Sequence, residues 1–364
     1  MVAEWEGADE AYALSLQKNE FISRDAFMGE LTESEKFWVG LQPFLLMRGY
    51  KLRPRYQPDW TPSWLKPKRI GRDIYSFEDA LSLPRPGLID ATRQCDGTKV
   101  VIKCIDTSTE ELPIYRYLAS PELMANPRNR TAPLLDVVLL PNDDSQVLIV
   151  MPQLLQFNQV PFRRVGEVFE AFHQLLQGLE FMHDLNVSHR DACYFNLMMD
   201  ASKVVPRGFH FAQRMTNDGV SLTFRWRARW SVRPVPYHFI DFGISRRYPT
   251  GLKDVKDTTR LGQDRSAPEY ARPEPYDPFK ADVYQLGNVF LKVIEPYDPD
   301  GLGVFLALGK AMTSPDPDDR PSPAAALQML DGMDKRLFKR RIWRPWRTWS
   351  EKFEISFCGV NSLV

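Results

Sequence analysis

The sequence predicts an α+β fold in which a small β-rich part is followed by a larger, mainly helical part. A chain of 364 residues is too long for one small core, so two lobes with extensions are expected. Short β-branched runs at 99–103 and 146–151 are typical of strands. From Arg164 to Leu185, apolar residues recur every three or four positions, which predicts an amphipathic helix at the start of the second part.

The composition is that of an ordinary globular protein, and its overall charge indicates no particular class of partner. Lys plus Arg and Asp plus Glu both total 47, so no overall charge indicates nucleic acid or a membrane surface. The four cysteines are scattered without metal-ligand spacing, which favours a reduced intracellular setting, cytoplasmic or nuclear. The N-terminus lacks the apolar core of a signal peptide, and the apolar runs near 134–140 and 147–155 are too short to span a membrane.

Residues 1–70 are expected to be an N-terminal extension. Thr32 and Glu35 form a capping-box pattern, which predicts a helix that continues to about Leu46. The segment 58–64, P-D-W-T-P-S-W, is rich in Trp and Pro. We expect it to be a strap that packs on a neighbouring domain rather than a flexible linker.

The β-rich part is expected over 71–152. A glycine turn at Gly97 leads into a β-branched strand that ends at Lys103. A short helix is then expected from Glu111, with apolar residues three, four and seven positions later. Pro113 is compatible with it only in the first helical turn, where a missing N–H is tolerated.

Two motifs in the second part suggest phosphoryl transfer. The first is 187–196, V-S-H-R-D-A-C-Y-F-N, and the second is Asp241-Phe242-Gly243, which follows a short apolar run. Phosphoryl transfer requires a carboxylate that orients the attacking hydroxyl, oxygen ligands for Mg²⁺ and a cation on the phosphates. Either motif alone is a weak signal, but their order and the position of Asn196 together form a strong one.

At these motifs the sequence resembles the eukaryotic protein-kinase family. The resemblance implies a two-lobed protein-kinase-like fold that uses ATP and Mg²⁺ to phosphorylate a protein substrate. It implies these roles: Asp191 as catalytic base, Asn196 and Asp241 as metal ligands, Lys103 as phosphate anchor, and Glu111 as partner of that lysine, with Glu110 as the alternative partner. The wording of the leader, G-Y-x-L-R-x-R-Y and W-x-P-S-W, is similar to the leaders of fungal protein-kinase-like proteins.

The resemblance also implies the lining of a nucleotide pocket between the lobes. Met151-Pro152-Gln153-Leu154 matches the hinge, where Gln153 and Leu154 would offer backbone groups to adenine. The remaining predicted lining residues are apolar: Leu88, Val101, Met151 and Met198.

The sequence departs from the family at two places. The three glycine positions of the phosphate-covering loop fall on Leu81, Leu83 and Pro86, with only Gly87 nearby. Cys193 stands where Ser/Thr kinases carry a lysine that supports the transferred phosphate. Both departures favour the alternative of a pseudokinase, the same fold serving as a binding module. A small-molecule kinase is a third hypothesis, against which Ala267-Pro268-Glu269 and Arg320 weigh.

Several residues are expected to have structural roles. By the same resemblance, His189 packs beneath Phe242, Asp282 accepts hydrogen bonds from the catalytic-loop backbone, and Glu269 and Arg320 form a buried ion pair. Arg190 would read a phosphate on the segment after the second motif, with Thr258 and Thr259 as candidate phosphosites.

Two basic segments complete the domain organisation, with the helical part assigned to 153–332. An insertion at 201–236 has seven Lys or Arg against one acid, and its alternation predicts an extended hairpin arm that either binds phosphates and bases or packs on the lobe. The tail, 333–364, carries Trp343, Trp346 and Trp349, which indicate either docking on the domain or a basic amphipathic helix. The oligomeric state is not indicated.

Overall fold

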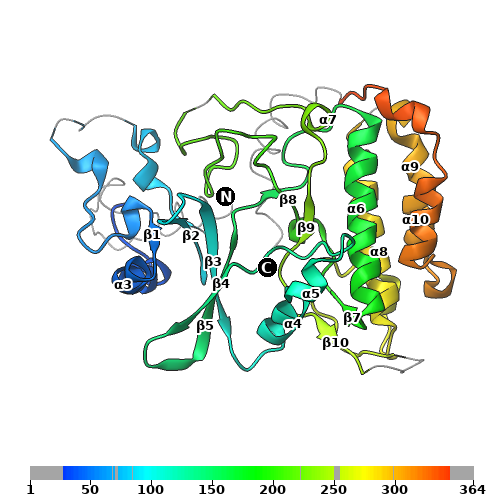
Figure 1. Cartoon of the computed structure of the whole chain (residues 1–364), viewed down its shortest axis with the longest axis horizontal. Helices are drawn as coiled ribbons and strands as arrows, with labels where there is room; N and C mark the ends of the chain where they lie inside the picture. The colour runs from blue at the N-terminus through cyan, green and yellow to red at the C-terminus, as the bar shows by residue number, and fades with distance from the viewer. Residues whose placement is uncertain are drawn as a thin grey trace, which may run out of the picture.

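The structure, a computed structural model, describes residues 28–67, 69, 73–83, 85–221, 223–249, 255–297 and 299–344. A five-stranded antiparallel sheet lies on one side of the molecule and a group of long helices on the other (Figure 1). The predicted α+β class is confirmed. The strands of the large sheet, in spatial order, are β1 (Tyr50–Leu52), β2 (Leu88–Arg93), β3 (Lys99–Asp106), β5 (Asp143–Pro152) and β4 (Asp136–Leu140).

The helical side is built from four helices that run alongside one another (Figure 1). These are α6 (Val165–Asp184), α8 (Pro278–Ile294), α9 (Pro299–Met312) and α10 (Pro323–Asp331). The predicted helix from Arg164 to Leu185 is therefore confirmed, with Arg164 and Leu185 as its cap residues. The shorter helices are α4 (Glu111–Leu118), α5 (Pro121–Met124) and α7 (Arg229–Val232).

Two small sheets lie between the large sheet and the helices. One has the order β6-β8-β9, formed by β6 (Leu155–Gln156), β8 (Leu197–Met199) and β9 (Tyr237–Phe239). The other pairs β7 (Val187–Ser188) with β10 (Arg246–Arg247). Because β8 follows the first motif and β9 precedes the second, their antiparallel pairing brings the two motifs together.

Residues 33–52 of the predicted N-terminal extension pack on the large sheet or form part of it. Helix α3 (Glu33–Met47) starts with the predicted capping box, in which Thr32 and Glu35 exchange side-chain-to-backbone hydrogen bonds. Trp38 of this helix is buried with residues of β1 to β5 on one face of the sheet. Strand β1 pairs with β2, so residues 50–52 form the sheet's edge.

The Trp/Pro segment packs against residues 74–80, which follow it in the chain; whether these belong to a separate domain stays a prediction. Trp64 is buried against Ile74, Phe77 and Ala80. The indole N–H of Trp60 donates to the carboxylate of Asp79 at 2.9 Å. A partly exposed Trp and a buried one therefore tie this segment to the chain just before β2.

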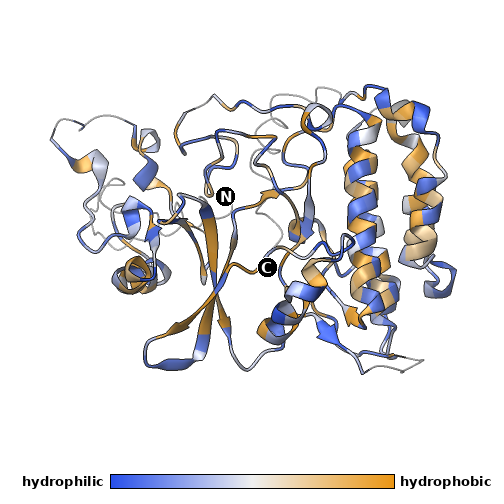
Figure 2. Ribbon diagram, viewed as in Figure 1, coloured by the Kyte–Doolittle hydropathy of each residue, from blue (hydrophilic) through white to orange (hydrophobic). Residues whose placement is uncertain are grey.

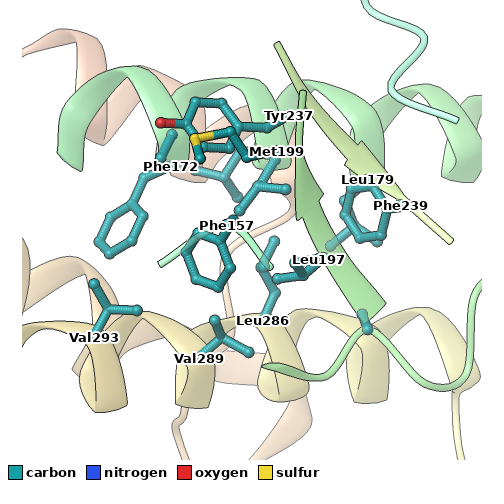
Figure 3. Close-up of a cluster of buried hydrophobic side chains, with 14 of the residues drawn as sticks. Phe157, Phe172, Leu179, Leu197, Met199, Tyr237, Phe239, Leu286, Val289 and Val293 are labelled. Carbon is teal, nitrogen blue, oxygen red and sulfur yellow. The ribbon is translucent and has the colours of Figure 1, made fainter. Parts of the chain in front are cut away.

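The largest apolar cluster joins the other face of the sheet to the helices. In Figure 3, Phe172 and Leu179 of α6 lie above Val289 and Val293 of α8, with Leu197 of β8 between the helices. Figure 2 shows the matching apolar colour along β3 and β5 and on parts of α6 and α8. Burying side chains of this size contributes roughly 1.5–3 kcal/mol each, so this cluster stabilises the contact between the sheet and the helices.

Strand β9 lies close against α6 because of one glycine. A Cβ on Gly178 would lie 2.9 Å from the Phe239 ring and 2.6 Å from the Arg130 Cβ. Only a residue without a side chain allows this approach. The contact matters for function because β9 leads directly into Asp241.

Candidate functional site

Lys103 lies between two carboxylates. Its Nζ is 2.6 Å from Glu111 Oε1 and 2.9 Å from Asp241 Oδ1. Strand β3 supplies the lysine, and the first turn of α4 supplies Glu111. Glu111, and not the alternative Glu110, is thus the carboxylate that contacts the lysine; Glu110 is the N-cap residue of α4.

The electrostatics of this triad keep its cation charged. Burial opposes the charge on Lys103, but Asp241 and Glu111 outweigh it and raise the pKa of the lysine. Burial raises the pKa of Glu111 against the opposing effect of the lysine. Partial burial of Asp241 opposes its charge, but Lys103 and the Gly243 N–H outweigh it and lower the pKa of Asp241. At neutral pH, Asp241 therefore remains an anionic oxygen donor.

The loop at 189–196 brings Asp191 and Asn196 into contact. The amide nitrogen of Asn196 donates to Asp191 Oδ2 at 2.8 Å and to the Asp191 carbonyl at 3.0 Å. This leaves the amide oxygen of Asn196 without a role in those two bonds. Asn196 directly precedes β8. The partner strand of β8 is β9, which leads to Asp241.

The predicted supports of this loop are in place. The Asp282 carboxylate accepts the backbone N–H groups of His189 at 2.8 Å and Arg190 at 2.6 Å. The His189 ring lies 5.3 Å from the Phe242 ring, centroid to centroid, and its Nε2 is 3.2 Å from the Ile240 carbonyl. His189 and Asp282 are both fully buried.

Two residues of the site have strained backbones. Arg190 and Asp241 both have φ of +65°, a region that residues other than glycine rarely adopt. Such conformations cost of order 1–3 kcal/mol each and persist only where the surroundings impose them. One of these residues precedes Asp191 and the other is Asp241 itself. Contacts of the surrounding residues must therefore offset the free-energy cost of these two backbone conformations.

Asp191 is only 6% exposed, and neutral donors surround it. The Gln263 backbone N–H donates to its Oδ1 at 2.8 Å. Burial and Asp191 raise the pKa of the Cys193 thiol, so this side chain is uncharged at neutral pH. The sequence did not indicate Gln263, because no spacing rule links it to Asp191, 72 residues earlier.

The Arg190 guanidinium already has partners. It donates to the Ile244 carbonyl at 3.0 Å and to the Thr259 carbonyl at 3.3 Å, and lies 3.4 Å from the Asp257 carboxylate. Asp257 also accepts the Tyr248 hydroxyl at 2.8 Å. A carboxylate of the chain thus lies where the resemblance implies a phosphate; the phosphosites Thr258 and Thr259 stay predictions.

The predicted nucleotide-lining residues lie along one side of the sheet and below it. Val101 and Met151 are paired in register, and both belong to the main apolar cluster, against which Leu88 packs. Leu88 is opposite Lys103 in the sheet. Met198 is buried on β8.

The predicted hinge residues Gln153 and Leu154 lie beside the insertion 201–236. The Gln153 backbone N–H donates to the Lys99 carbonyl at 3.1 Å, and its side chain donates to the Phe209 carbonyl of the insertion at 2.9 Å. A hollow of about 410 Å³ is lined by Gln153 and Leu154 but by none of the four apolar lining residues. The insertion therefore lies against the hinge.

The connection from β1 to β2, residues 53–87, lies where the resemblance implies a short glycine loop. Its described part contains 3-10 helices at Pro54–Tyr56, Ser63–Leu65, Ile74–Ser76 and Glu78–Ala80. Arg53 anchors it through Asp90 at 2.8 Å, Glu78 at 2.9 Å and the Leu81 carbonyl at 2.9 Å. Arg53 therefore ties the start of this connection to its later residues and to β2.

The insertion does not form the hairpin arm that its alternation predicts. No strand forms in the described residues of 201–236, which contain turns and the short helix α7. Arg229 is buried, and its guanidinium donates to the carbonyls of Phe157 at 2.7 Å and Val160 at 2.9 Å. The prediction was wrong because the alternation of residue types within the segment carries no information about distant partners. The carbonyls of Phe157 and Val160 hold Arg229 inside the protein.

The insertion also contacts the β1–β2 connection. His210 Nε2 lies 3.0 Å from Glu78 Oε1. A Cβ on Gly219 would lie 2.9 Å from the Leu81 side chain. Phe209 and Phe211 pack against the main apolar cluster, so the insertion follows the packed alternative for its aromatic residues.

The tail is described only to residue 344. Trp343 is 70% exposed, whereas Trp346 and Trp349 lie outside the described residues. Across the described ranges, no helix has the length and apolar character needed to cross a membrane. Among these residues, too, no group of three or more His, Cys, Asp or Glu is placed to hold a metal ion.

Part of the chain is similar to a known fungal protein kinase. Over 138 residues the chain is 25% identical to a serine/threonine-protein kinase, PTK2, of Candida glabrata. The match covers 36% of this chain and 15% of that protein. No protein-family model matches the chain. The match supports a similarity to protein kinases, and it extends over a minority of both sequences.

Proposed function

We propose that this protein is an ATP- and Mg²⁺-dependent protein kinase that transfers the γ-phosphoryl group to a protein hydroxyl, Ser or Thr rather than Tyr. The observation that carries the proposal is the position of Lys103 between Glu111 and Asp241, at 2.6 and 2.9 Å. In kinases, a lysine of this kind must pair with a helix glutamate while an aspartate holds the metal.

Each polar residue of the site has one role in this proposal. Lys103 neutralises the α- and β-phosphates, and Glu111 orients it. Asp191 orients the acceptor hydroxyl and accepts its proton as the bond to phosphorus forms. The predicted parts 71–152 and 153–332 act as the two lobes around this chemistry, and α3 and β1 add to the first of them.

Asp241 and Asn196 fit the requirements of a Mg²⁺ ion. Mg²⁺ prefers hard oxygen ligands and takes only one or two carboxylates from a protein, with phosphates and water as the remaining ligands. The Asp241 side chain is 42% exposed and anionic, so one of its oxygens is accessible. Bound between these residues and the phosphates, the ion would neutralise charge on the transferring group.

A second candidate function, a pseudokinase that serves as a binding module, is favoured by two observations. The glycine loop is replaced by the long connection 53–87, and Cys193 supplies no cation beside Asp191. In this alternative the same fold has weak or no nucleotide binding, and its surface recognises a partner protein.

The deciding experiment is a melting-temperature series with ATP and Mg²⁺, followed by phosphoryl transfer to a generic protein substrate. A ligand that binds the folded state must stabilise it, by about 2.7 kcal/mol at one hundred times its Kd. A Mg²⁺-dependent shift with transfer supports the kinase. A melting-temperature shift without phosphoryl transfer, or no shift at high ATP concentration, would favour the binding module instead.

A further inference from the structure

Helix α8 presents three polar side chains toward the loop that contains Asp191 and toward residues 264–266. Asp282, Gln285 and Asn288 are spaced by three, which places them on one face of the helix. Asp282 and Gln285 are fully buried. The roles described above account for Asp282 but not for the other two.

Gln285 joins two segments that are far apart in the sequence. Its Oε1 accepts the Ala192 backbone N–H at 3.0 Å. Its Nε2 donates to the Arg190 carbonyl at 3.3 Å and to the Asp264 carbonyl at 3.0 Å. One buried amide therefore holds the residues on both sides of Asp191 and ties them to the segment 262–264.

The segment 262–264 in turn contacts Asp191 directly. The Gln263 N–H donates to Asp191 Oδ1. A Cβ on Gly262, whose φ is +105°, would lie 3.0 Å from the same oxygen and 3.1 Å from the Arg190 carbonyl. Asn288 holds the far end of this segment through Asp264 Oδ2 at 3.0 Å and Ser266 Oγ at 2.8 Å.

The strain at Arg190 explains why such a support is needed. Its φ of +65° is unfavourable for a residue with a side chain. Asp282 fixes its N–H and Gln285 its C=O, so side chains of α8 bind both polar groups of the strained residue. Without these bonds, we expect Arg190 to relax to a more favourable φ, which would move the backbone before Asp191.

We propose that Gln285 is a positioning residue for Asp191: it holds the catalytic loop and the segment 262–264 together, so that the Asp191 carboxylate has a single orientation toward the acceptor hydroxyl. This inference rests on the proposed phosphotransferase function. Gln285 acts through the backbone and does not touch substrate.

The test compares two buried glutamines. Gln285→Met removes the bridge with little change in volume. Gln174→Met is the matched control, because Gln174 on α6 is also buried. Its side chain donates to the Val235 carbonyl at 2.9 Å and accepts the Tyr237 N–H at 3.2 Å, and neither Asp191 nor the segment 262–264 is among these partners. For each variant, kcat, the Kd of ATP with Mg²⁺, and the hydrogen exchange of the Gln263 amide are measured.

We expect Gln285→Met to lower kcat about 100-fold, the order expected when a reacting group is misplaced by about 1 Å. The Kd of ATP should stay close to that of the parent, since Lys103 and Asp241 are not among the contacts of Gln285. The Gln263 amide, which is bonded to Asp191 and not to Gln285, should exchange faster. Gln174→Met should leave kcat and this exchange unchanged.

Equal kcat and equal Gln263 exchange in the two variants would overturn the positioning role. If the parent neither binds ATP nor transfers phosphate, the proposed function fails, and the amide exchange alone decides the inference. Faster Gln263 exchange in Gln285→Met only would then retain the bridge as the support of Asp191, and unchanged exchange would reject it.

Discussion

The guanidinium of Arg320 forms a buried, two-point ion pair with the carboxylate of Glu269, with N–O distances of 2.6 and 2.7 Å. The Arg320 side chain is fully buried and also donates to the carbonyls of Ser314 at 2.8 Å and Lys280 at 3.0 Å. This pair links the segment after Asp241 to the connection between α9 and α10, and the sequence predicted it.

Arg320→Ala should destabilise the fold by about 3–5 kcal/mol, because it leaves the Glu269 charge buried without a partner. The measurement is the free energy of unfolding in urea. Arg336→Ala is the control: its pair with Asp334 is exposed and should contribute about 0–1 kcal/mol. Equal stability of the two variants would contradict the structural role of the buried pair.

Lys103→Met should abolish the melting-temperature shift produced by ATP and Mg²⁺, because the cation that neutralises the phosphates is removed. Lys99→Met is the matched control, since Lys99 lies on the same strand with an exposed side chain bonded to Thr92. Its nucleotide response should match that of the parent. A full shift in Lys103→Met would mean that this lysine is not at the phosphates.

Substitution of Asp191 and substitution of Asp241 should impair different steps, phosphoryl transfer alone or nucleotide binding as well. Asp241→Asn should weaken both Mg²⁺–ATP binding and transfer. Asp191→Asn should keep binding and lose transfer, by about 10²–10⁴-fold for a lost general base. Nucleotide titrations and ³²P transfer measure the two effects, and transfer that persists in Asp191→Asn would remove Asp191 from the mechanism.

Acid should destabilise the protein through His238. Burial lowers the pKa of His238 to about 4, and its Nδ1 has no partner among the described residues. An unfolded chain binds this proton near pH 6.5, so between pH 6.5 and 4 the unfolded state holds more protons and stability falls as the pH falls. The loss at pH 5 is about 2 kcal/mol.

The comparison for that effect is His238→Gln, which cannot bind a proton in this range. Unfolding free energies at pH 7 and pH 5 should fall by about 2 kcal/mol more in the parent than in the variant. An identical pH dependence in both proteins would show that His238 titrates normally in the folded state.

The inward orientation of Arg229 can be tested against a neighbour on the same segment. Arg229→Met leaves the carbonyls of Phe157 and Val160 without their donor and should cost about 2 kcal/mol or more. Arg227→Met changes an exposed side chain and should be nearly neutral. Urea unfolding of both variants distinguishes a folded insertion from a free basic arm, for which the two substitutions would be equivalent.

Local patterns predicted the elements around the site well. The capping box at Thr32, the apolar period of α6 and the β-branched run ending at Lys103 are each signals within one element. Glu111 could be assigned because its apolar neighbours follow at helical spacing. The insertion defeated the same reasoning, because the partners of Arg229 lie about 70 residues away.

The sequence by itself determined the α+β class, the strand of Lys103, the helix of Glu111 and the two motifs, because periodicity, capping and motif spacing act between residues that are close along the chain. Tertiary structure decided which groups surround Asp191, that β1 joins the sheet, and that the insertion lies on the hinge. Gln263 and Gln285 reach Asp191 or its neighbours over 72 and 93 residues. Contacts of that kind depend on how α8, β8 and β9 pack, and no pattern of neighbouring residues encodes them.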